Sequence, residues 1–241
     1  MTRRRFPVGK TLLYVFMSLW ALTTIYPFIW VILNSFKPRG LIRSDTFSLP
    51  IGDKFTLENY VTAFKRVDIG TAYVNSIVIS GAVTVVVMVL AGLAAYAMVR
   101  YSFRLRGFLH SMIIASMMFP VFSTIIPVFR MESSWGIVNT GSIWLTRLSV
   151  VLPQIAGNLS FAIIVLMGFI RSLPVDLEEA AYLEGYNVYQ IFFRIIMPLA
   201  KPSFATVGIF TFLWSYNDLF LQMFFLRSKK FFTITRLLNV I

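Results

Sequence analysis

Five long apolar segments dominate this chain of 241 residues. Each is about as long as the roughly 20 apolar residues that a helix needs to cross the roughly 30 Å hydrocarbon core of a bilayer. Backbone groups in hydrocarbon must be hydrogen-bonded within the protein, and the short alternating strands of a barrel are not seen in the sequence, so these segments are expected to be helices. The sequence therefore predicts an all-α, polytopic membrane protein. The predicted spans are residues 11–36, 72–99, 107–129, 148–170 and 203–226.

The charge of the chain agrees with a membrane location. Only 13% of the residues are charged, about half of the roughly 25% found in soluble domains. The net charge of +12 would suggest nucleic acid binding in a soluble protein. Here the Lys and Arg residues flank the apolar segments, where they contact lipid headgroups and set the topology. Lipid is therefore an expected partner, and nucleic acid is not.

The N-terminus is basic and leads directly into the first apolar segment. A signal peptide is the alternative, but Thr11–Phe36 is too long for one and no A-x-A cleavage site follows. Counting Lys and Arg does not decide the orientation, since an inside N-terminus places 10 of them inside and 12 outside. The first helix usually dominates the topology. The basic cluster before it favours a cytoplasmic N-terminal segment, residues 1–10.

The chain lacks the side chains that most enzyme and metal sites use. It has no cysteine and one histidine, His110, which excludes disulfides, thiol catalysis, zinc–thiolate sites and multi-histidine metal sites. No nucleophile–base arrangement stands out either. We therefore predict no catalytic residue, no metal ligand and no enzymatic activity of the chain by itself.

Two of the predicted spans have features of their own. The span 72–99 is rich in small residues, which let helix backbones approach closely, although an Ala-rich helix that faces lipid is an alternative. Pro120 and Pro127 predict a kinked or broken helix in the span 107–129, which could line a cavity or serve packing. The small residues are Gly81, Ala91, Gly92, Ala94, Ala95 and Ala97.

Residues 171–202 form an unusually polar connection between two spans. Pro174 fits the first turn of a helix, and acidic residues follow it where the positive helix end favours them. Gly185 fits the stop of this helix, and a second short helix is expected from Asn187. The segment is thus predicted to lie along the membrane as a docking surface or as an ordinary amphipathic loop. The acids are Asp176, Glu178 and Glu179, and the expected apolar face is Val188, Ile191, Phe192 and Ile195.

The spacing within this connection resembles the EAA loop of permeases of ATP-binding-cassette (ABC) importers. That pattern is Glu-Ala-Ala, three residues, Gly, nine residues, Ile, one residue and Leu-Pro. Met197 replaces the Leu, a volume-conserving exchange. Other segments resemble the smaller permease of the maltose-type, carbohydrate-uptake group: Tyr73–Ser80, Met117–Phe129, Gly136–Thr140 and Trp214–Leu219. The matching positions of the loop are Glu179, Ala180, Ala181, Gly185, Ile195, Met197 and Pro198.

The resemblance implies a type I ABC importer permease fold, with one permease domain over residues 11–241 and a cytoplasmic coupling loop at 171–202. Such permeases usually have six core spans, so a sixth span is expected after Ile241 and the segment 231–241 is expected outside. The implied partners are a second, different permease, a dimer of ATP-binding subunits and an extracellular sugar-binding protein, in a bacterial-type cytoplasmic membrane. The implied ATPase contacts are Glu179, Ala180, Ala181, Gly185, Ile195 and Pro198.

No cofactor is expected in this chain. ATP and Mg²⁺ would bind to the partner ATPase, and no G-x-x-x-x-G-K-[ST] sequence occurs here. Glu179 would make charged hydrogen bonds to that ATPase, the alanines would allow close approach, and Gly185 would provide the turn.

The last span contains the candidates for the substrate path. Asp218 is an intramembrane carboxylate, which is a functional candidate, although a structural pairing with a neighbouring helix is an alternative. Asn217 lies beside it, and Tyr216 could stack on a sugar or simply pack. An ion-coupled secondary transporter would use such a carboxylate and is the main rival to the ABC importer. A membrane scaffold without transport activity is a further alternative.

Overall fold

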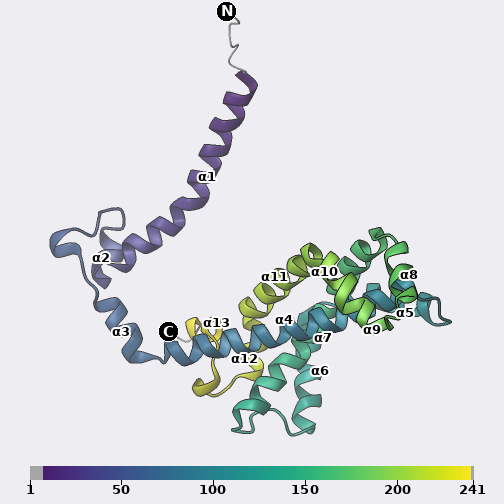
Figure 1. Cartoon of the computed structure of the whole chain (residues 1–241). Helices are drawn as coiled ribbons and strands as arrows, with labels where there is room; N and C mark the ends of the chain where they lie inside the picture. Colours follow the sequence, from purple (N-terminus) through teal and green to yellow (C-terminus); the bar gives the residue numbers. More distant parts are fainter. Residues whose placement is uncertain (1–7, 240–241) are drawn as a thin grey trace, which may run out of the picture. The chain divides into compact units, whose positions relative to one another are not determined.

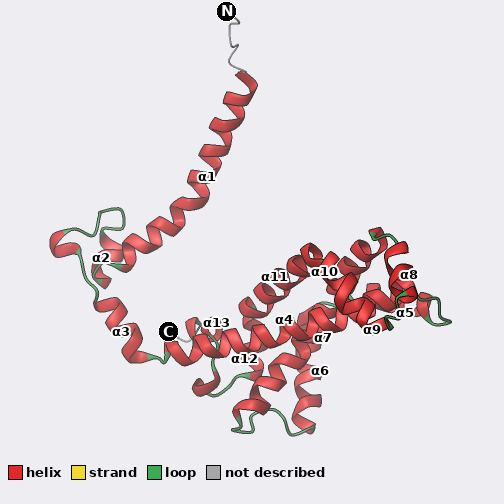
Figure 2. Cartoon of the chain, viewed as in Figure 1, coloured by secondary structure: helices red, strands yellow, loops and turns green. Residues whose placement is uncertain are grey.

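The computed structural model describes residues 8–239, and within this range every regular element is a helix (Figure 2). Residues 1–7 of the predicted cytoplasmic N-terminus and the final two residues of the predicted outer segment lie outside the described range. The contacts divide the chain into two compact units, Met1–Asp68 and Ile69–Ile241. A division by contacts does not test whether residues 11–241 form one permease domain, so that domain stays a prediction.

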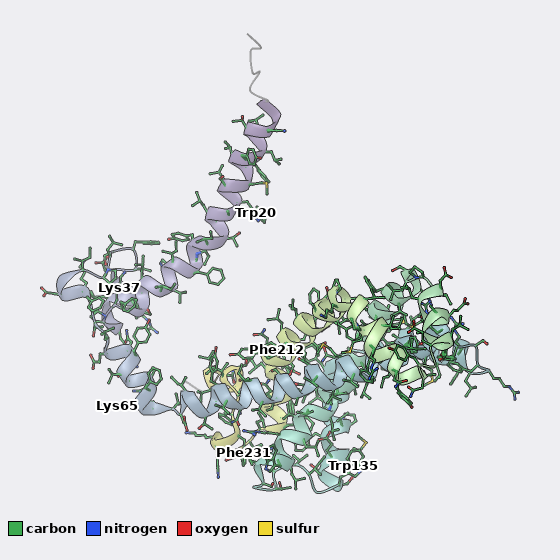
Figure 3. The ribbon with its side chains drawn as sticks, in the orientation of Figure 1. Trp20, Lys37, Lys65, Trp135, Phe212 and Phe231 are labelled. Carbon is green, nitrogen blue, oxygen red and sulfur yellow. The ribbon has the colours of Figure 1, made fainter. Side chains whose placement is uncertain are left out.

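The first unit begins with a long apolar helix, α1 (Val8–Ser35). Its large apolar side chains from Leu12 to Ile29 are all exposed, and Trp20 is 69% exposed. Figure 3 labels Trp20 among the side chains of α1. A continuous apolar surface of this size requires lipid or protein to cover it. The unit continues with α2 (Arg39–Ser44), a 3₁₀ turn η1 (Gly52–Lys54) and α3 (Glu58–Arg66).

A buried lysine closes the loop that follows α1. Lys37 is fully buried, and its Nζ donates hydrogen bonds to the backbone oxygens of Asp45 at 3.1 Å and Thr46 at 2.8 Å. Asn59 Nδ2 donates to the backbone oxygens of Ser35 and Lys37 at 3.0 and 2.7 Å. A buried ammonium needs such partners to offset its lost hydration. These bonds fix the polar loop against the end of α1.

The second unit is built around three long helices, α4, α7 and α11, with shorter helices around them (Figure 1). The elements are α4 (Ile69–Arg100), α5 (Arg106–Ser116), α6 (Val121–Ser134), α7 (Ile143–Ser172), α8 (Asp176–Leu183), α9 (Val188–Ile191), a π-helical turn η2 (Phe192–Ile196), α10 (Met197–Leu199), α11 (Lys201–Asn217), α12 (Leu219–Phe225), a 3₁₀ turn η3 (Lys229–Phe231) and α13 (Ile234–Leu238).

Several of the small residues of α4 are buried. Ala91 and Ala95 are fully buried where α4 packs against its neighbours. A Cβ atom on Gly92 would lie 2.8 Å from the ring of Phe204 and 2.9 Å from the ring of Phe192. The predicted close packing is therefore confirmed for Ala91, Gly92 and Ala95, whereas Gly81 and Ala94 are half-buried and Ala97 is exposed.

The predicted span 107–129 is divided, as its prolines indicate. It forms α5 and α6, separated by Met117–Pro120, and Pro120 immediately precedes α6. Pro127 lies inside α6 without ending it. The prediction of a kinked or broken helix is confirmed, and the break lies at Pro120.

The prediction of one helix over 203–226 is wrong. The helix ends at Asn217, and Asp218 has a non-helical backbone with φ −71° and ψ 88°. The Asp218 carboxylate accepts a hydrogen bond from the backbone N–H of Leu221 at 3.1 Å and so caps the separate helix α12. An Asp side chain at this position stabilises a new helix start rather than the continuation of the old one.

Within residues 8–239, three helices are long and apolar enough to span a membrane, namely Gly9–Ser35, Ile69–Arg100 and Ile143–Ser172. A fourth candidate is the pair Val188–Leu199 and Lys201–Asn217, which is bent by 81°. The predicted spans 107–129 and 203–226 each consist of two helices, so crossing by these two segments stays a prediction.

The C-terminal turn and helix are tied to the start of α4. Asn75, 1% exposed, donates from Nδ2 to the backbone oxygen of Phe232 at 3.1 Å. Ser76 Oγ accepts from the backbone N–H of Ile234 at 2.8 Å. Arg147 Nη2 of α7 donates to Asn75 Oδ1 at 2.9 Å, so three segments meet at one amide side chain.

The close approach at Gly92 leads to a stability prediction. Gly92→Val should destabilise the protein by about 1–3 kcal/mol, because overpacking displaces Phe192 and Phe204. Gly81→Val is the matched control, since a Cβ there meets no atom within 4 Å. Thermal unfolding of the purified protein in detergent measures both. Equal melting temperatures for the two variants would contradict the packing described here.

Candidate functional site

The polar connection 171–202 folds into short helices, as predicted. The first helix, α8, carries three acids in its first turn, where the positive end of the helix dipole favours them. Pro174 precedes the N-cap residue Val175, so it lies just before the first turn rather than inside it. The second helix, α9, begins after Asn187.

The turn between α8 and α9 depends on Gly185. This residue has φ +85°, a left-handed conformation that glycine adopts without steric cost. The N–H of Gly185 donates to the backbone oxygen of Tyr182, and the N–H of Tyr186 donates to that of Ala181, both at 3.0 Å. These two bonds form a Schellman motif, which ends a helix cleanly. The predicted stop at Gly185 is confirmed.

The second short helix is also well defined. The Asn187 side chain accepts from the Gln190 N–H, and the Gln190 side chain accepts from the Asn187 N–H, both at 2.9 Å, which forms a capping box. Its predicted apolar face is partly wrong. Ile191, Phe192 and Ile196 are buried, whereas Val188 is exposed. The π-helical turn adds a residue to the turn, so Ile196 takes the inward position expected for Ile195.

The two faces of α8 differ. Glu178 and Ala181 face inward and are each 4% exposed. Asp176, Glu179, Ala180 and Leu183 are exposed, and Leu183 has a relative exposure of 91%. Asp176 and Leu183 each lie three or four positions from Glu179 and Ala180, so these four exposed residues share one face of the helix. Among the other motif residues, Gly185 and Pro198 are exposed and Ile195 is half-buried.

A buried ion pair attaches α8 to the end of α4. Arg100 Nε lies 2.5 Å from Glu178 Oε1, and the Tyr96 hydroxyl donates to Glu178 Oε2 at 2.8 Å. Arg100 Nη2 also donates to the backbone oxygen of Leu173 at 2.9 Å. The Glu178 and Arg100 side chains are only 5% and 11% exposed. Both carboxylate oxygens have donors, as a buried charge requires.

Aromatic contacts reinforce this attachment. The Tyr96 ring lies 5.6 Å from that of Phe192, between ring centroids, which links α4 to the π-helical turn. The hydroxyls of Tyr101 and Tyr182 lie 2.9 Å apart. Burial and this contact raise the pKa of Tyr101 above its usual value. The inward face of α8 is thus fixed, whereas Asp176, Glu179, Ala180 and Leu183 on its outward face are exposed.

Sequence reasoning missed the role of Glu178. It treated the residue as one of three acids at a helix start. The available signal was Arg100, the only charge at the C-terminal end of an otherwise uncharged span. The partners are 78 residues apart, so their pairing appears only once α4 and α8 are packed together.

The polar residues at the α11–α12 break form a network with α7. Gln154 Nε2 donates to Asp218 Oδ2 at 3.2 Å, and Ser215 Oγ donates to Gln154 Oε1 at 2.6 Å. Gln222 Nε2 donates to the backbone oxygen of Ser215 at 3.1 Å. The backbone N–H of Leu221 donates to the other carboxylate oxygen, Oδ1. Asp218 is therefore paired with a neighbouring helix, which the sequence allowed as the alternative to a functional role.

The three substrate-path candidates do not share one site. Asn217 and Asp218 line a cavity of about 370 Å³, together with Phe122, Gln154 and Trp214. Tyr216 is not among the residues that line it. Its ring stacks on Phe212 with centroids 5.9 Å apart, and its backbone oxygen accepts from Thr235 Oγ1 at 2.7 Å.

The described residues contain no group of three or more His, Cys, Asp or Glu side chains that could hold a metal ion.

Comparisons with known proteins agree with this architecture. Residues 88–239 match the family described as binding-protein-dependent transport system inner membrane component. The chain is 35% identical over 210 residues to the diacetylchitobiose uptake system permease protein NgcG of Streptomyces coelicolor, covering 87% of this chain and 67% of that protein. It is 32% identical over 209 residues to the trehalose transport system permease protein SugB of Mycobacterium tuberculosis, covering 87% and 73%.

A solved structure has the same fold. It is a bacterial ABC transporter involved in the import of the acidic polysaccharide alginate, and one of its chains matches with a TM-score of 0.83 at 23% identity. The match covers 100% of this chain and 82% of that chain. The predicted fold class, an all-α polytopic permease of the ABC importer kind, is confirmed.

Glu178 and Glu179 give a paired stability prediction. Glu178→Ala should destabilise the protein by about 3 kcal/mol or more, because it leaves Arg100 buried without its counter-charge. Glu179→Ala should change stability by less than about 0.5 kcal/mol, because Glu179 is exposed. Thermal unfolding in detergent tests both. A larger loss for Glu179→Ala than for Glu178→Ala would contradict the placement of the two side chains.

Proposed function

Because this chain belongs to the family of binding-protein-dependent transport system inner membrane components, we propose that it is a permease subunit of an ATP-driven importer for a sugar or oligosaccharide. It would form half of the translocation path with a second, different permease. The observation that carries the coupling part of this proposal is the exposed outer face of α8, held in place by the Glu178–Arg100 ion pair.

The outer face of α8 suits a groove on another protein. Glu179 offers a carboxylate for charged hydrogen bonds, which are stronger than neutral ones. Ala180 permits close approach, and Leu183 offers an apolar side chain that is 91% exposed. The inner face is anchored, so a force on α8 would be transmitted to α4 through Arg100 and Tyr96. We propose that an ATP-binding subunit docks on this face.

The remaining partners follow from the same proposal. A dimer of ATP-binding subunits would bind ATP and Mg²⁺ and close on ATP binding, which would move the coupling loop 171–202. An extracellular binding protein would deliver the sugar. The loop would lie on the cytoplasmic side of a bacterial-type cytoplasmic membrane, with the N-terminus on the same side. The chain itself would have no enzymatic activity.

A saccharide substrate is supported by the names of NgcG and SugB, which are permease proteins for diacetylchitobiose and trehalose. A third relative, 30% identical over 210 residues, is the melibiose/raffinose/stachyose import permease protein MelC of Bacillus subtilis. The cavity beside Asn217 and Asp218 is the candidate part of the path. It combines amide and carboxylate groups with the aromatic rings of Phe122 and Trp214. Tyr216 stays a candidate for the substrate path, although it does not line this cavity.

Uptake experiments test the substrate class and the energy source. The complex with its partner subunits, in proteoliposomes, should take up at least one of diacetylchitobiose, trehalose, melibiose, raffinose and stachyose when ATP is hydrolysed. Uptake that persists without ATP hydrolysis and stops when the ion gradient is collapsed would instead identify an ion-coupled secondary transporter.

Substitutions of Gly185 test coupling. Gly185→Val should abolish most uptake while ATP hydrolysis continues, because a β-branched residue cannot adopt φ +85° without strain and the turn after α8 would change. Gly185→Asn is the matched control, since Asn tolerates the left-handed conformation, and it should retain most uptake. The ratio of sugar transported to ATP hydrolysed is the measurement. An unchanged ratio in Gly185→Val would contradict the coupling role of this turn.

A further inference from the structure

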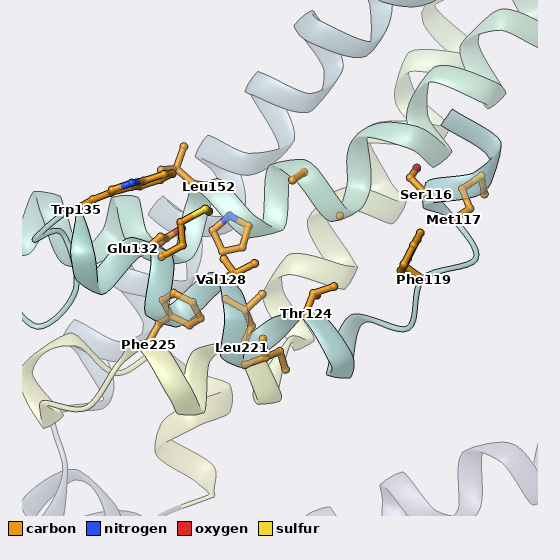
Figure 4. Close-up of a pocket in the computed structure, with 15 residues that line it drawn as sticks. Ser116, Met117, Phe119, Thr124, Val128, Glu132, Trp135, Leu152, Leu221 and Phe225 are labelled. Atoms are coloured by element: carbon orange, nitrogen blue, oxygen red, sulfur yellow. The ribbon is translucent and has the colours of Figure 1, made fainter. Parts of the chain in front are cut away.

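A second cavity lies between the broken helix α5–α6 and the helices α7 and α12. It has a volume of about 570 Å³, within the range of roughly 300–1,000 Å³ typical of small-molecule sites. Glu132, Trp135 and Phe225 lie at one end of it, and Ser116, Met117 and Phe119 lie at the other (Figure 4). Most of the remaining lining is aliphatic, including Val128 and Leu152.

Glu132 is the unusual residue of this cavity. Its side chain is 1% exposed, yet its Oε2 atom has no hydrogen-bond partner among the described residues. The described part of the chain also contains no cationic side chain in ion-pair distance of Glu132. Burying a carboxyl group without a partner costs free energy that a donor within reach would recover. Glu132 is therefore placed to accept a hydrogen bond from a molecule in the cavity.

The neighbouring side chains limit what that molecule can be. A bare metal ion would need several oxygen ligands, and Glu132 is the one carboxylate that lines the cavity. A lipid chain would fill the apolar volume but would leave Oε2 unpaired. A saccharide ring satisfies both features, because its hydroxyls donate hydrogen bonds and its C–H faces pack on aromatic rings. Trp135 and Phe225 provide such rings beside Glu132 (Figure 4).

This cavity adjoins the one beside Asn217 and Asp218. The two cavities share three lining residues, Pro153, Gly157 and Leu221. Pro153 and Gly157 are one turn apart on α7, and a Cβ atom on Gly157 would meet no atom within 4 Å. The absence of a side chain at Gly157 keeps the face of α7 open between the two cavities. A saccharide longer than one ring could extend from one cavity into the other.

We infer that the Glu132 cavity is a saccharide subsite of this permease, in which the Glu132 carboxylate accepts hydrogen bonds from sugar hydroxyls and Trp135 and Phe225 pack against the ring. The inference rests on the proposed function, because it requires that the chain transports saccharides. It adds a residue, Glu132, that neither the coupling loop nor the α11–α12 break includes.

The absence of cysteine allows a direct test in the assembled complex. A single Val128→Cys places a thiol in the cavity, one turn before Glu132 on α6. Its labelling by N-ethylmaleimide should be slowed by whichever of the five saccharides named above the complex imports. Ser133→Cys is the control, because Ser133 is exposed on the same helix and does not line the cavity. Its labelling should not change.

The role of Glu132 is tested in the Val128→Cys background. Adding Glu132→Ala should raise the saccharide concentration for half-maximal protection by about fivefold to tenfold, the loss expected for one hydrogen bond. Glu132→Gln keeps the shape of the side chain and an acceptor oxygen, so it should give a smaller rise. If the Glu132→Ala variant does not fold, the Glu132→Gln variant still tests the role of the carboxyl group.

The possible results distinguish failure of the subsite from failure of the proposed function. Import of a saccharide without protection of Val128→Cys would overturn the subsite and leave the proposed function intact. Protection of Val128→Cys that stays the same after Glu132→Ala and Glu132→Gln are added would overturn the role of the carboxylate. No import of any of the five saccharides by the unmodified complex would contradict the proposed substrate class, and the subsite with it.

Discussion

The carboxylate of Glu178 lies at the C-terminal end of α4, where Arg100 and Tyr96 supply its charge partner and its second hydrogen bond. Removing a carboxylate and a guanidinium from water is costly, so the pair is stable only with nearly ideal geometry and full hydrogen bonding. Both conditions are met here. The direction of α8 follows from this contact, and so does the choice of which side chains face outward.

The outward face of α8 and the turn after it are consequences of that anchor. With Glu178 and Ala181 turned inward, the spacing of a helix turns Glu179, Ala180 and Leu183 outward. The Schellman motif at Gly185 and the capping box at Asn187 then set the path of the chain toward α11. An anchored inner face and an exposed outer face are consistent with the proposed role of α8 in coupling to a partner subunit.

The sequence predicted the features that depend on local chemistry. Apolar length predicted the long helices, Pro120 predicted the break before α6, and Gly185 predicted the end of α8. The features it missed depend on packing between distant segments. Hydropathy predicts one continuous helix through Asp218, because it does not reveal that the Asp218 side chain accepts a hydrogen bond from the Leu221 N–H and so caps a new helix. The pairing of Glu178 with Arg100 and the burial of Glu132 likewise appear only in the packed structure, and the π-helical turn shifted an apolar face by one residue.

We propose above all that the outer face of α8 is a cytoplasmic docking surface for an ATP-binding subunit. The most direct measurement is the reaction of Leu183→Cys with a maleimide that cannot cross the membrane, with Ala181→Cys as the buried comparison. Leu183→Cys should react only from the cytoplasmic side and should become protected when the ATP-binding subunits are added, whereas Ala181→Cys should react slowly throughout. Reaction of Leu183→Cys from the outer side, or no protection by the ATP-binding subunits, would contradict the claim.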